Sequence, residues 1–255
     1  MEREFVIGRV SVIIPVYNCG KYISRALESV YAQNYENIEI VLVDDKSSDN
    51  SAEIILEHKK FHPEIIYYLQ EKNQGAGVAR NKALELATGQ YVAFLDSDDV
   101  WKKNKLEKQI DFMIQTGTPF SYTAIEMIDK DNNLIKGKRN LKTECNYKNL
   151  LHNTIIATSS VVIDRGNIGD FRMSLRRGGQ DYATWLMLLK GGIVAKGINE
   201  ALVMYRILDD SLSSNKFKSI VQLWDIQRND EKIAPLVVMF NIFLWGINVI
   251  RKYFI

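Results

Sequence analysis

The strongest constraint on the fold is an alternation of apolar runs with helix-like segments over residues 1–100. Four runs read as buried strands, at residues 10–16, 38–43, 65–69 and 91–95. The segments between them, residues 22–31, 49–58 and 76–87, read as helices. Nearly all-apolar strands that alternate with helices predict a mostly parallel sheet with helices on both faces.

The rest of the chain is less regular. Helices are predicted at residues 105–115 and 181–189, strands at 120–128, 158–163 and 201–207, and a polar loop at 209–215. The 255 residues, of which 46% are hydrophobic, suit one large domain or two closely packed halves. We expect a first half at 1–100, a smaller second half at 101–215 and a helical tail at 216–255.

Composition narrows the class of protein. A net charge of +2 gives no support to nucleic-acid binding. Cys19 and Cys145 match no metal or redox spacing, so we expect both to be reduced in a cytoplasmic protein. The apolar run near the N-terminus is too short for a signal peptide.

The C-terminal region contains an uncharged stretch at residues 234–250. It is slightly shorter than the roughly 20 residues of a membrane-spanning helix. On a helix, Asn241, Trp245, Asn248 and Lys252 would share one face. Two interpretations stay open, a helix lying in a membrane interface and a helix packed on the domain through a narrow polar seam.

Polar clusters follow each of the first four predicted strands, at residues 15–18, 44–47, 71–75 and 96–99. Ligands of parallel sheets bind beyond the carboxyl ends of the strands. The last cluster holds Asp96, Asp98 and Asp99, whose mutual repulsion a hard divalent cation would offset. This edge of the sheet is therefore predicted to bind a metal and, through it, phosphates.

Other side chains near these clusters suit a nucleotide. Tyr17 offers a ring for stacking on a base, although an aromatic at the edge of the core is the commoner reading. Gly75 and Gly77 permit close backbone approach before a helix whose N-terminus favours anions. Arg80 could reach a phosphate from that helix, with a solvated surface arginine as the alternative.

Four blocks of sequence resemble the nucleotide-sugar-dependent glycosyltransferases of family 2, which have the GT-A fold. They are SVIIPVYN at 11–18, VDDKSSDNS at 43–51, NQGAGVARN at 73–81 and GQYVAFLDSDD at 89–99. A weaker match continues through residues 180–185 and 205–213. The resemblance implies a Rossmann-like, mostly parallel sheet flanked by helices.

The resemblance also implies a donor site built from Pro15, Tyr17, Asn18, Asp45, Gly75, Arg80, Asp96 and Ser97. Asp45 would accept a hydrogen bond from the imide N–H of uracil, and the alternative is a turn residue that caps the next helix. Asp98 would coordinate Mn²⁺ or Mg²⁺, and Asp96 would contact the ribose or the surroundings of the metal. Asp44 would fix the loop geometry, and Asp99 would support the metal loop or start the next helix.

The same resemblance places the catalytic base in an acidic pair before a helix, which reads Gln180-Asp181 here instead of Glu-Asp. Asp181 is the candidate base, with a helix cap as the alternative. Arg177, Gln180 and Trp185, together with Arg176, are expected near the acceptor or the diphosphate. Residues 205–213 lack the His of some relatives, so metal binding would rest on Asp98, phosphates and water, or recruit Asp209 or Asp210.

The function implied is transfer of a sugar, with inversion, from a nucleotide-diphosphate donor such as a UDP-sugar to a hydroxyl. The acceptor would be a saccharide or a lipid-linked saccharide of surface polysaccharide synthesis, such as O-antigen or capsule. The C-terminal helix would then make a peripheral contact with the inner face of the cell membrane. Two alternatives stay open, a non-catalytic nucleotide-sugar-binding module and an Asp-based phosphohydrolase, which would leave three of the four blocks unexplained.

Overall fold

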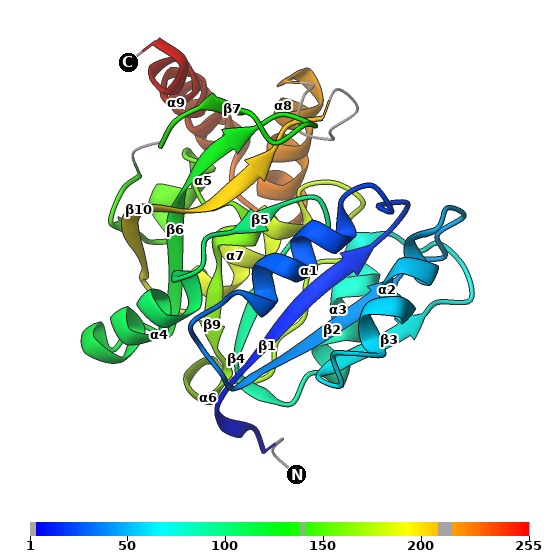
Figure 1. The fold of residues 1–255 in the computed structure, drawn as a ribbon. Helices are drawn as coiled ribbons and strands as arrows, with labels where there is room; N and C mark the ends of the chain where they lie inside the picture. Colours follow the sequence, from blue (N-terminus) through cyan, green and yellow to red (C-terminus); the bar gives the residue numbers. More distant parts are fainter. Residues whose placement is uncertain (1–3, 139–140, 209–215, 255) are drawn as a thin grey trace.

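A mixed ten-stranded sheet forms the centre of the molecule (Figure 1). The computed structural model describes residues 4–138, 141–208 and 216–254. The strand order is β3-β2-β1-β4-β9-β6-β10-β5, with β7 paired to β6 and β8 paired to β10. Strands from both predicted halves thus share one sheet, while the division at residues 100 and 215 stays a prediction.

The first part of the chain follows the predicted alternation closely. Its elements are β1 (Val6–Val16), α1 (Ile23–Tyr31), β2 (Ile38–Asp44), α2 (Ser51–Lys59), β3 (Ile65–Leu69), α3 (Ala76–Leu86) and β4 (Gly89–Phe94). β1 pairs in parallel with both β2 and β4, and β2 pairs in parallel with β3. The predicted parallel sheet is confirmed here, and its carboxyl ends meet at one edge.

The second part contains both regular and short elements. They are β5 (Val100–Trp101), α4 (Lys105–Thr116), β6 (Phe120–Ile128), β7 (Leu134–Lys136), β8 (Glu144–Cys145), α5 (Tyr147–Leu151), the 3₁₀ helix η1 (Thr158–Ser160), β9 (Val162–Asp164), α6 (Arg165–Ile168), α7 (Gln180–Lys190) and β10 (Ala195–Arg206). The predicted loop at 209–215 lies outside the described residues.

The strand predicted at 158–163 is wrong in its first half. Residues 158–160 form η1, and only from Val162 does the chain join the sheet as β9, antiparallel to β4 and β6. The turn is closed by backbone bonds from Ser160 to Ala157 and from Val161 to Thr158. The hydrogen bonds of the Ser159 side chain, described below, depend on this 3₁₀ turn.

Two hydrophobic cores lie on opposite faces of the sheet. Val41 and Val43 of β2 face α3 and α7, whereas Ile40 and Leu42 belong to the core that includes α1 and α4. Alternate residues of one strand thus serve both cores, as strand geometry requires. The strands β1, β2 and β4 read as largely apolar because both of their faces are buried in the sheet, whereas β3 is an edge strand with exposed residues.

The C-terminal tail consists of α8 (Lys216–Asp225), a π-helical turn η2 (Ile226–Asp230) and α9 (Pro235–Phe254). Asn241 donates to Gln227 Oε1 at 2.8 Å, Trp245 to Thr154 Oγ1 at 3.1 Å, and Asn248 to the carbonyl of His152 at 3.0 Å. The predicted polar seam is therefore confirmed as a docking face for these three residues, and the side chain of Lys252 lies outside the described part of the chain. None of the helices in the described ranges is long and apolar enough to cross a bilayer.

Candidate active site

The three carboxylates after β4 occupy different environments. Asp99 is buried and accepts hydrogen bonds from Ser159 Oγ at 2.5 Å and from the backbone N–H of Arg206 at 2.8 Å. Asp96 and Asp98 are only partly buried. Asp99 thus anchors the loop, whereas Asp96 and Asp98 stay accessible to a ligand.

The electrostatics of this loop suit a cation. Burial, followed by repulsion from Asp96, raises the pKa of the Asp98 carboxyl to about 6. Burial and the same neighbouring acids hold the pKa of the Asp99 carboxyl well above its usual range. A hard divalent cation beside Asp96 and Asp98 would relieve this crowding, and carboxylate oxygens are the ligands that Mg²⁺ and Mn²⁺ prefer.

The protein supplies few ligands of its own for such a cation. Among the described residues, no group of three or more His, Cys, Asp or Glu side chains could hold a metal. Asp209 and Asp210, which the sequence offered as recruits, lie outside the described ranges. The two carboxylates fit a metal whose remaining positions are filled by phosphate oxygens and water.

Arg80 lies beside the metal loop and not on the open surface. It is 5% exposed and forms an ion pair with Asp96. Its buried Nε has no hydrogen-bond partner in the described part of the chain. The alternative of a solvated surface arginine is therefore wrong, and the guanidinium is fixed at the edge where phosphates are predicted.

Asp45 shapes the loop between β3 and α3. Only 2% exposed, it accepts hydrogen bonds from Gln70 Nε2 at 2.6 Å and from the backbone N–H groups of Gln74 and Gly75, both at 2.7 Å. It does not cap the next helix, because Asn50 is the N-cap residue of α2. The predicted contact of Asp45 with uracil stays a prediction, and it would have to coexist with these three bonds.

Asp44 fixes the turn that follows β2, as predicted. Its carboxylate accepts from the backbone N–H of Ser47 at 2.7 Å and from the hydroxyl of Tyr67 at 3.0 Å. Asn18 binds the same turn, because its side-chain oxygen accepts from the backbone N–H of Ser48 at 2.8 Å. The side chain of Asn18 therefore joins the end of β1 to the turn after β2, and the side chain of Asp44 joins the end of β2 to β3.

The remaining predicted donor residues lie along the same carboxyl edge. The ring of Tyr17 is 53% exposed, so it is available for stacking. Pro15 is partly buried and precedes the buried Val16 at the end of β1, and Ser97 is partly buried in the loop after β4. Gly75 precedes α3 with a φ of +94° and open space around its Cα, which a backbone approached by a ligand requires.

Asp181 is joined to the metal loop through two consecutive residues of η1. Thr158 Oγ1 donates to Asp181 Oδ2 at 3.2 Å. The next residue, Ser159, accepts from the backbone N–H of Asp96 at 3.0 Å and donates to Asp99. The candidate base and the candidate metal site are therefore brought together by the turn that the sequence predicted as a strand.

The first turn of α7 packs against the first turn of α3. A Cβ on Gly77 would collide with Oε1 of Gln180 and with the carbonyl of Ser174. The buried Oε1 of Gln180 has no hydrogen-bond partner among the described residues. Asp181 does not cap α7, because Gly179 occupies the cap in a left-handed conformation.

One expected contact, that of Trp185, is wrong. Trp185 is 1% exposed and packs edge-on between Phe94 and Phe120, at ring-centroid distances of 5.6 and 5.2 Å, so it belongs to the core. Arg176 is engaged by the C-terminal tail, through ion pairs with Asp225 and Asp230 that raise its pKa. Arg177 is exposed, and its predicted contact with the acceptor or the diphosphate stays a prediction.

Two important residues were not given a role from the sequence. Ser159 carries no local signal, because its function depends on distant partners. Arg206 donates from Nε to the carbonyl of Asp98 at 2.7 Å, and to the carbonyl of Asp129 and to Asn132 Oδ1 at 2.6 and 2.7 Å. For Arg206, the signal available was its place at the end of a predicted strand, in a block that resembles family 2 glycosyltransferases.

Sequence comparison identifies glycosyltransferases as relatives of this chain. The sequence model of glycosyl transferase family 2 matches residues 11–178. TuaG of Bacillus subtilis, assigned provisionally to teichuronic acid biosynthesis, is 41% identical over 95% of this chain and 96% of its own. WfgD of Escherichia coli, a UDP-Glc:α-D-GlcNAc-diphosphoundecaprenol β-1,3-glucosyltransferase, is 37% identical over 93% of each chain.

Solved structures show the same fold at low sequence identity. TarS of S. aureus in complex with UDP superposes with a TM-score of 0.67 at 19% identity, covering 96% of this chain and 72% of that chain. The mannosyltransferase PcManGT of Pyrobaculum calidifontis, solved with GDP-Man and Mn²⁺, gives 0.71 at 17% identity with the same coverage. The chain therefore belongs to glycosyl transferase family 2, and it is a glycosyltransferase with the GT-A fold.

Proposed function

We propose that the protein transfers a sugar from a UDP-sugar, with inversion, to a hydroxyl of a lipid-linked saccharide in the synthesis of a surface polysaccharide. The single observation that carries this proposal is the η1 link between Asp181 and the loop of Asp96 and Asp98. It sets a candidate base beside a candidate diphosphate site. The activity named for WfgD supports the choice of donor and acceptor.

The donor is held along the carboxyl edge of the parallel strands. The exposed ring of Tyr17 stacks on the base, and the loop braced by Asp45 forms the opposite wall. Arg80 stays oriented by Asp96 and contributes positive charge near the phosphates. Asp98 and Asp96 would hold Mn²⁺ or Mg²⁺, which supplies positive charge to the departing diphosphate.

Asp181 acts on the acceptor. Inversion requires the acceptor hydroxyl to attack the anomeric carbon from the face opposite the diphosphate. Asp181 accepts the proton of that hydroxyl, and Thr158 holds one of its oxygens in place. Since Gln180 replaces the acid usual in the family, Asp181 is the carboxylate assigned to this step.

A panel of nucleotide sugars tests the reaction. We expect release of UDP from a UDP-sugar in the presence of Mn²⁺, accelerated by a lipid-linked saccharide, and little release of GDP from GDP-sugars. Asp98→Asn should remove the metal-dependent rate. Donor binding without any release would instead indicate a non-catalytic binding module, and release of inorganic phosphate from phosphomonoesters would indicate a phosphohydrolase.

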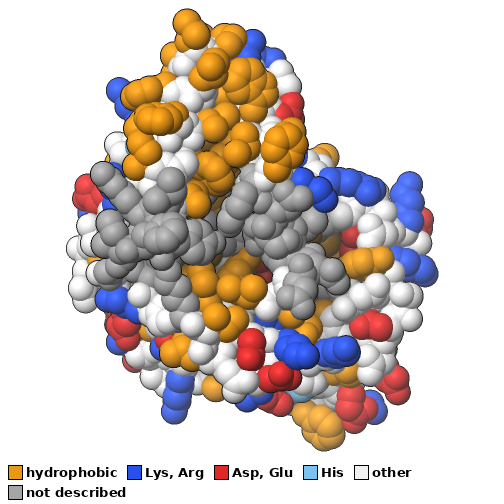
Figure 2. Space-filling view, turned by 90° about the horizontal axis from the view of Figure 1, so that it is seen from above, with side chains coloured by type: hydrophobic (Ala, Val, Ile, Leu, Met, Phe, Trp, Pro, Cys, Tyr) orange, Lys and Arg blue, Asp and Glu red, His pale blue; other side chains and the backbone are white. Residues whose placement is uncertain are grey.

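The C-terminal helices support the membrane part of the proposal. Opposite its docking face, α9 exposes large apolar side chains, and α8 exposes more beside it, so that this protruding lobe is largely hydrophobic (Figure 2). These residues are Phe217, Ile220, Val221, Trp224, Leu236, Val237, Met239, Phe240 and Phe243. Such a surface suits peripheral binding to the inner face of the cell membrane, where a lipid-linked acceptor resides.

Sedimentation with phospholipid vesicles tests this contact. Replacing Phe240 and Phe243 by Ser should weaken vesicle binding about tenfold or more, because each phenyl ring gains roughly 1.5–3 kcal/mol when fully buried. Ile114→Ser, at an exposed position of α4, is the matched control and should bind as the unchanged protein does. Equal sedimentation of the double variant would contradict the membrane contact.

A further inference from the structure

A cationic cavity lies beside the donor edge, between the start of α1 and the turn that joins β6 to β7. Its volume is about 370 Å³. The side chains that matter here are Lys21, Tyr22, Arg25, Lys130, Asn132 and Arg206. Arg206 also holds the metal loop, but none of the others belongs to the donor site or to the base described above. The cavity itself therefore has no role in the proposed reaction so far.

The charge of this cavity is strongly unbalanced. Lys21, Arg25 and Lys130 are exposed, and none of them forms an ion pair with another described residue. Glu28 is the acidic side chain of the lining. Four cationic side chains thus line the cavity beside one acidic side chain, and such an excess of positive charge favours an anionic ligand with several oxygens.

Arg206 makes the inner wall of the cavity rigid. It is 3% exposed, lies 4.8 Å above the ring of Tyr22, and binds Asn132 Oδ1 and the carbonyl of Asp129. Asp129 in turn accepts from the backbone N–H groups of Asp131 and Asn133, both at 2.8 Å. The β6–β7 turn that carries Lys130 is therefore pre-formed and needs little ordering when a ligand binds.

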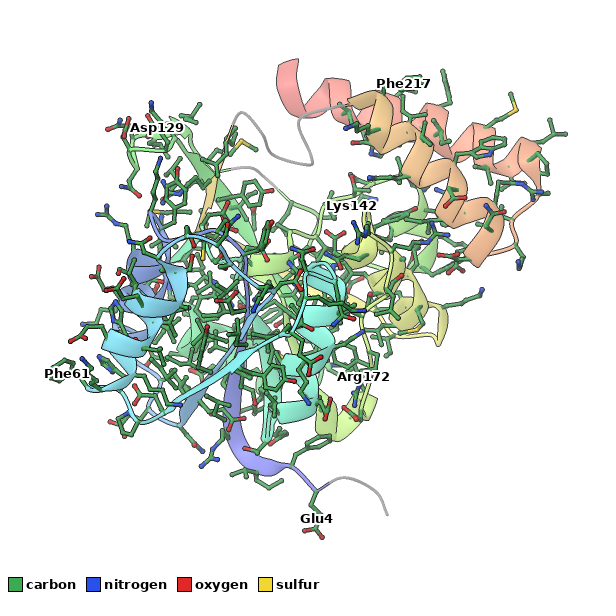
Figure 3. The ribbon with its side chains drawn as sticks, turned by 90° about the vertical axis from the view of Figure 1, so that its right-hand side faces the viewer. Glu4, Phe61, Asp129, Lys142, Arg172 and Phe217 are labelled. Atoms are coloured by element: carbon green, nitrogen blue, oxygen red, sulfur yellow. The ribbon has the colours of Figure 1, made fainter. Side chains whose placement is uncertain are left out.

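The cavity lies where the proposed acceptor would approach the metal loop. Arg206 reaches the carbonyl of Asp98 at 2.7 Å, so the cavity adjoins the metal loop from outside. Asp129, at the base of the turn, and Phe217, on the apolar lobe, lie on the same side of the molecule, opposite Glu4 (Figure 3). An acceptor held at a membrane on that side would lie near both the β6–β7 turn and the apolar lobe.

We propose that this cavity binds a phosphate group of an anionic acceptor, through Lys21, Arg25 and Lys130. The inference rests on the proposed function, because it assumes that the acceptor is a phosphate-linked saccharide. The ligand is a phosphate monoester or diphosphate whose oxygens the three cations share, while Arg206 keeps the wall in place. The site thereby selects phosphate-bearing acceptors over neutral ones.

Binding of inorganic pyrophosphate, measured by calorimetry without metal, tests the cavity independently of sugar transfer. The unchanged protein should bind pyrophosphate in the presence of saturating UDP. The double variant Arg25→Gln, Lys130→Gln should weaken this binding at least tenfold, whereas Lys59→Gln, an exposed lysine at the end of α2, should not change it. Displacement of pyrophosphate by UDP, or equal binding by the double variant, would overturn the proposal.

Kinetics with two acceptors then identify the source of the phosphate. We expect the double variant to raise the KM for a diphosphate-linked saccharide about tenfold, with the KM for the UDP-sugar and for a neutral alkyl glycoside changed less than twofold. A raised KM for the UDP-sugar would assign the cavity to the donor. An unchanged acceptor KM together with lost binding to phosphatidylglycerol vesicles would assign it to lipid headgroups, and either result would overturn the acceptor role.

Discussion

At the scale of single residues, the site depends on polar side chains whose partners are distant in the sequence. Asp45 was predicted from its place after a strand, but its three hydrogen bonds to residues 70–75 could not be predicted from local pattern. Asp99 likewise reads as a loop acid, yet it is a buried anchor for Ser159 and Arg206. Sequence pattern thus locates these acids, whereas tertiary contacts decide what each one does.

Asp45→Ala should destabilise the fold as well as weaken donor binding. It leaves three N–H groups of the β3–α3 loop without their buried carboxylate, which should lower the free energy of unfolding by about 2–4 kcal/mol. Urea denaturation measures this change, with the exposed Asp131→Ala as the control. Lost UDP binding with unaltered stability would show instead that Asp45 serves the nucleobase alone.

Lys105 has a buried side-chain amine without a hydrogen-bond partner in the described structure, and its Nζ lies 4.0 Å from the centre of the Trp101 ring. Burial holds the pKa of this amine well below its usual range. The unfolded state therefore binds more protons than the folded state, so stability should rise as pH increases from 7 toward 10.

Lys105→Met should remove this slope and stabilise the protein at pH 7 by about 1–3 kcal/mol, because no unpaired polar group is then buried. Thermal or urea unfolding at pH 7 and pH 9.5 measures both effects. The gain should shrink at the higher pH. A variant that is less stable than the unchanged protein at pH 7 would show that the contact with Trp101 outweighs the burial cost.

At the scale of elements, the C-terminal helices brace the turn that carries Asp181. Arg176 binds Asp225 and Asp230, and Gly178 lies so close to α8 that a Cβ there would collide with the side chain of Gln222. Ile226 approaches Gly179 in the same way. The tail is therefore part of the structure that positions the base, which the apolar pattern of residues 234–250 did not indicate.

Arg176→Gln should accordingly lower kcat about tenfold and leave the KM for the donor unchanged, because the base is displaced while the donor edge is intact. Arg176→Lys should restore part of the rate by keeping one ion pair. Steady-state kinetics with varied donor measure the difference. A raised donor KM at constant kcat would instead support the direct diphosphate contact expected from the sequence.

At the scale of the whole molecule, the first part of the fold was predictable and the second only partly so. The strands β1 to β4 are apolar on both faces, so their pattern is strong and their parallel order follows from the helices between them. The elements β5, β7 and β8 have two or three residues each, too few for any periodic signal. Antiparallel β9 joins the sheet by long-range pairing alone.

The central claim is that Asp181 is the base acting beside a donor bound at Asp98. The most direct test measures UDP binding and sugar transfer in the same preparation of Asp181→Asn. Asparagine keeps the shape and can still accept the bond from Thr158, but it cannot take a proton at neutral pH. We predict UDP affinity within twofold of the unchanged protein and transfer reduced by roughly 10²–10⁴-fold. Transfer at the unchanged rate would contradict the assignment of Asp181 and, with it, the proposed mechanism.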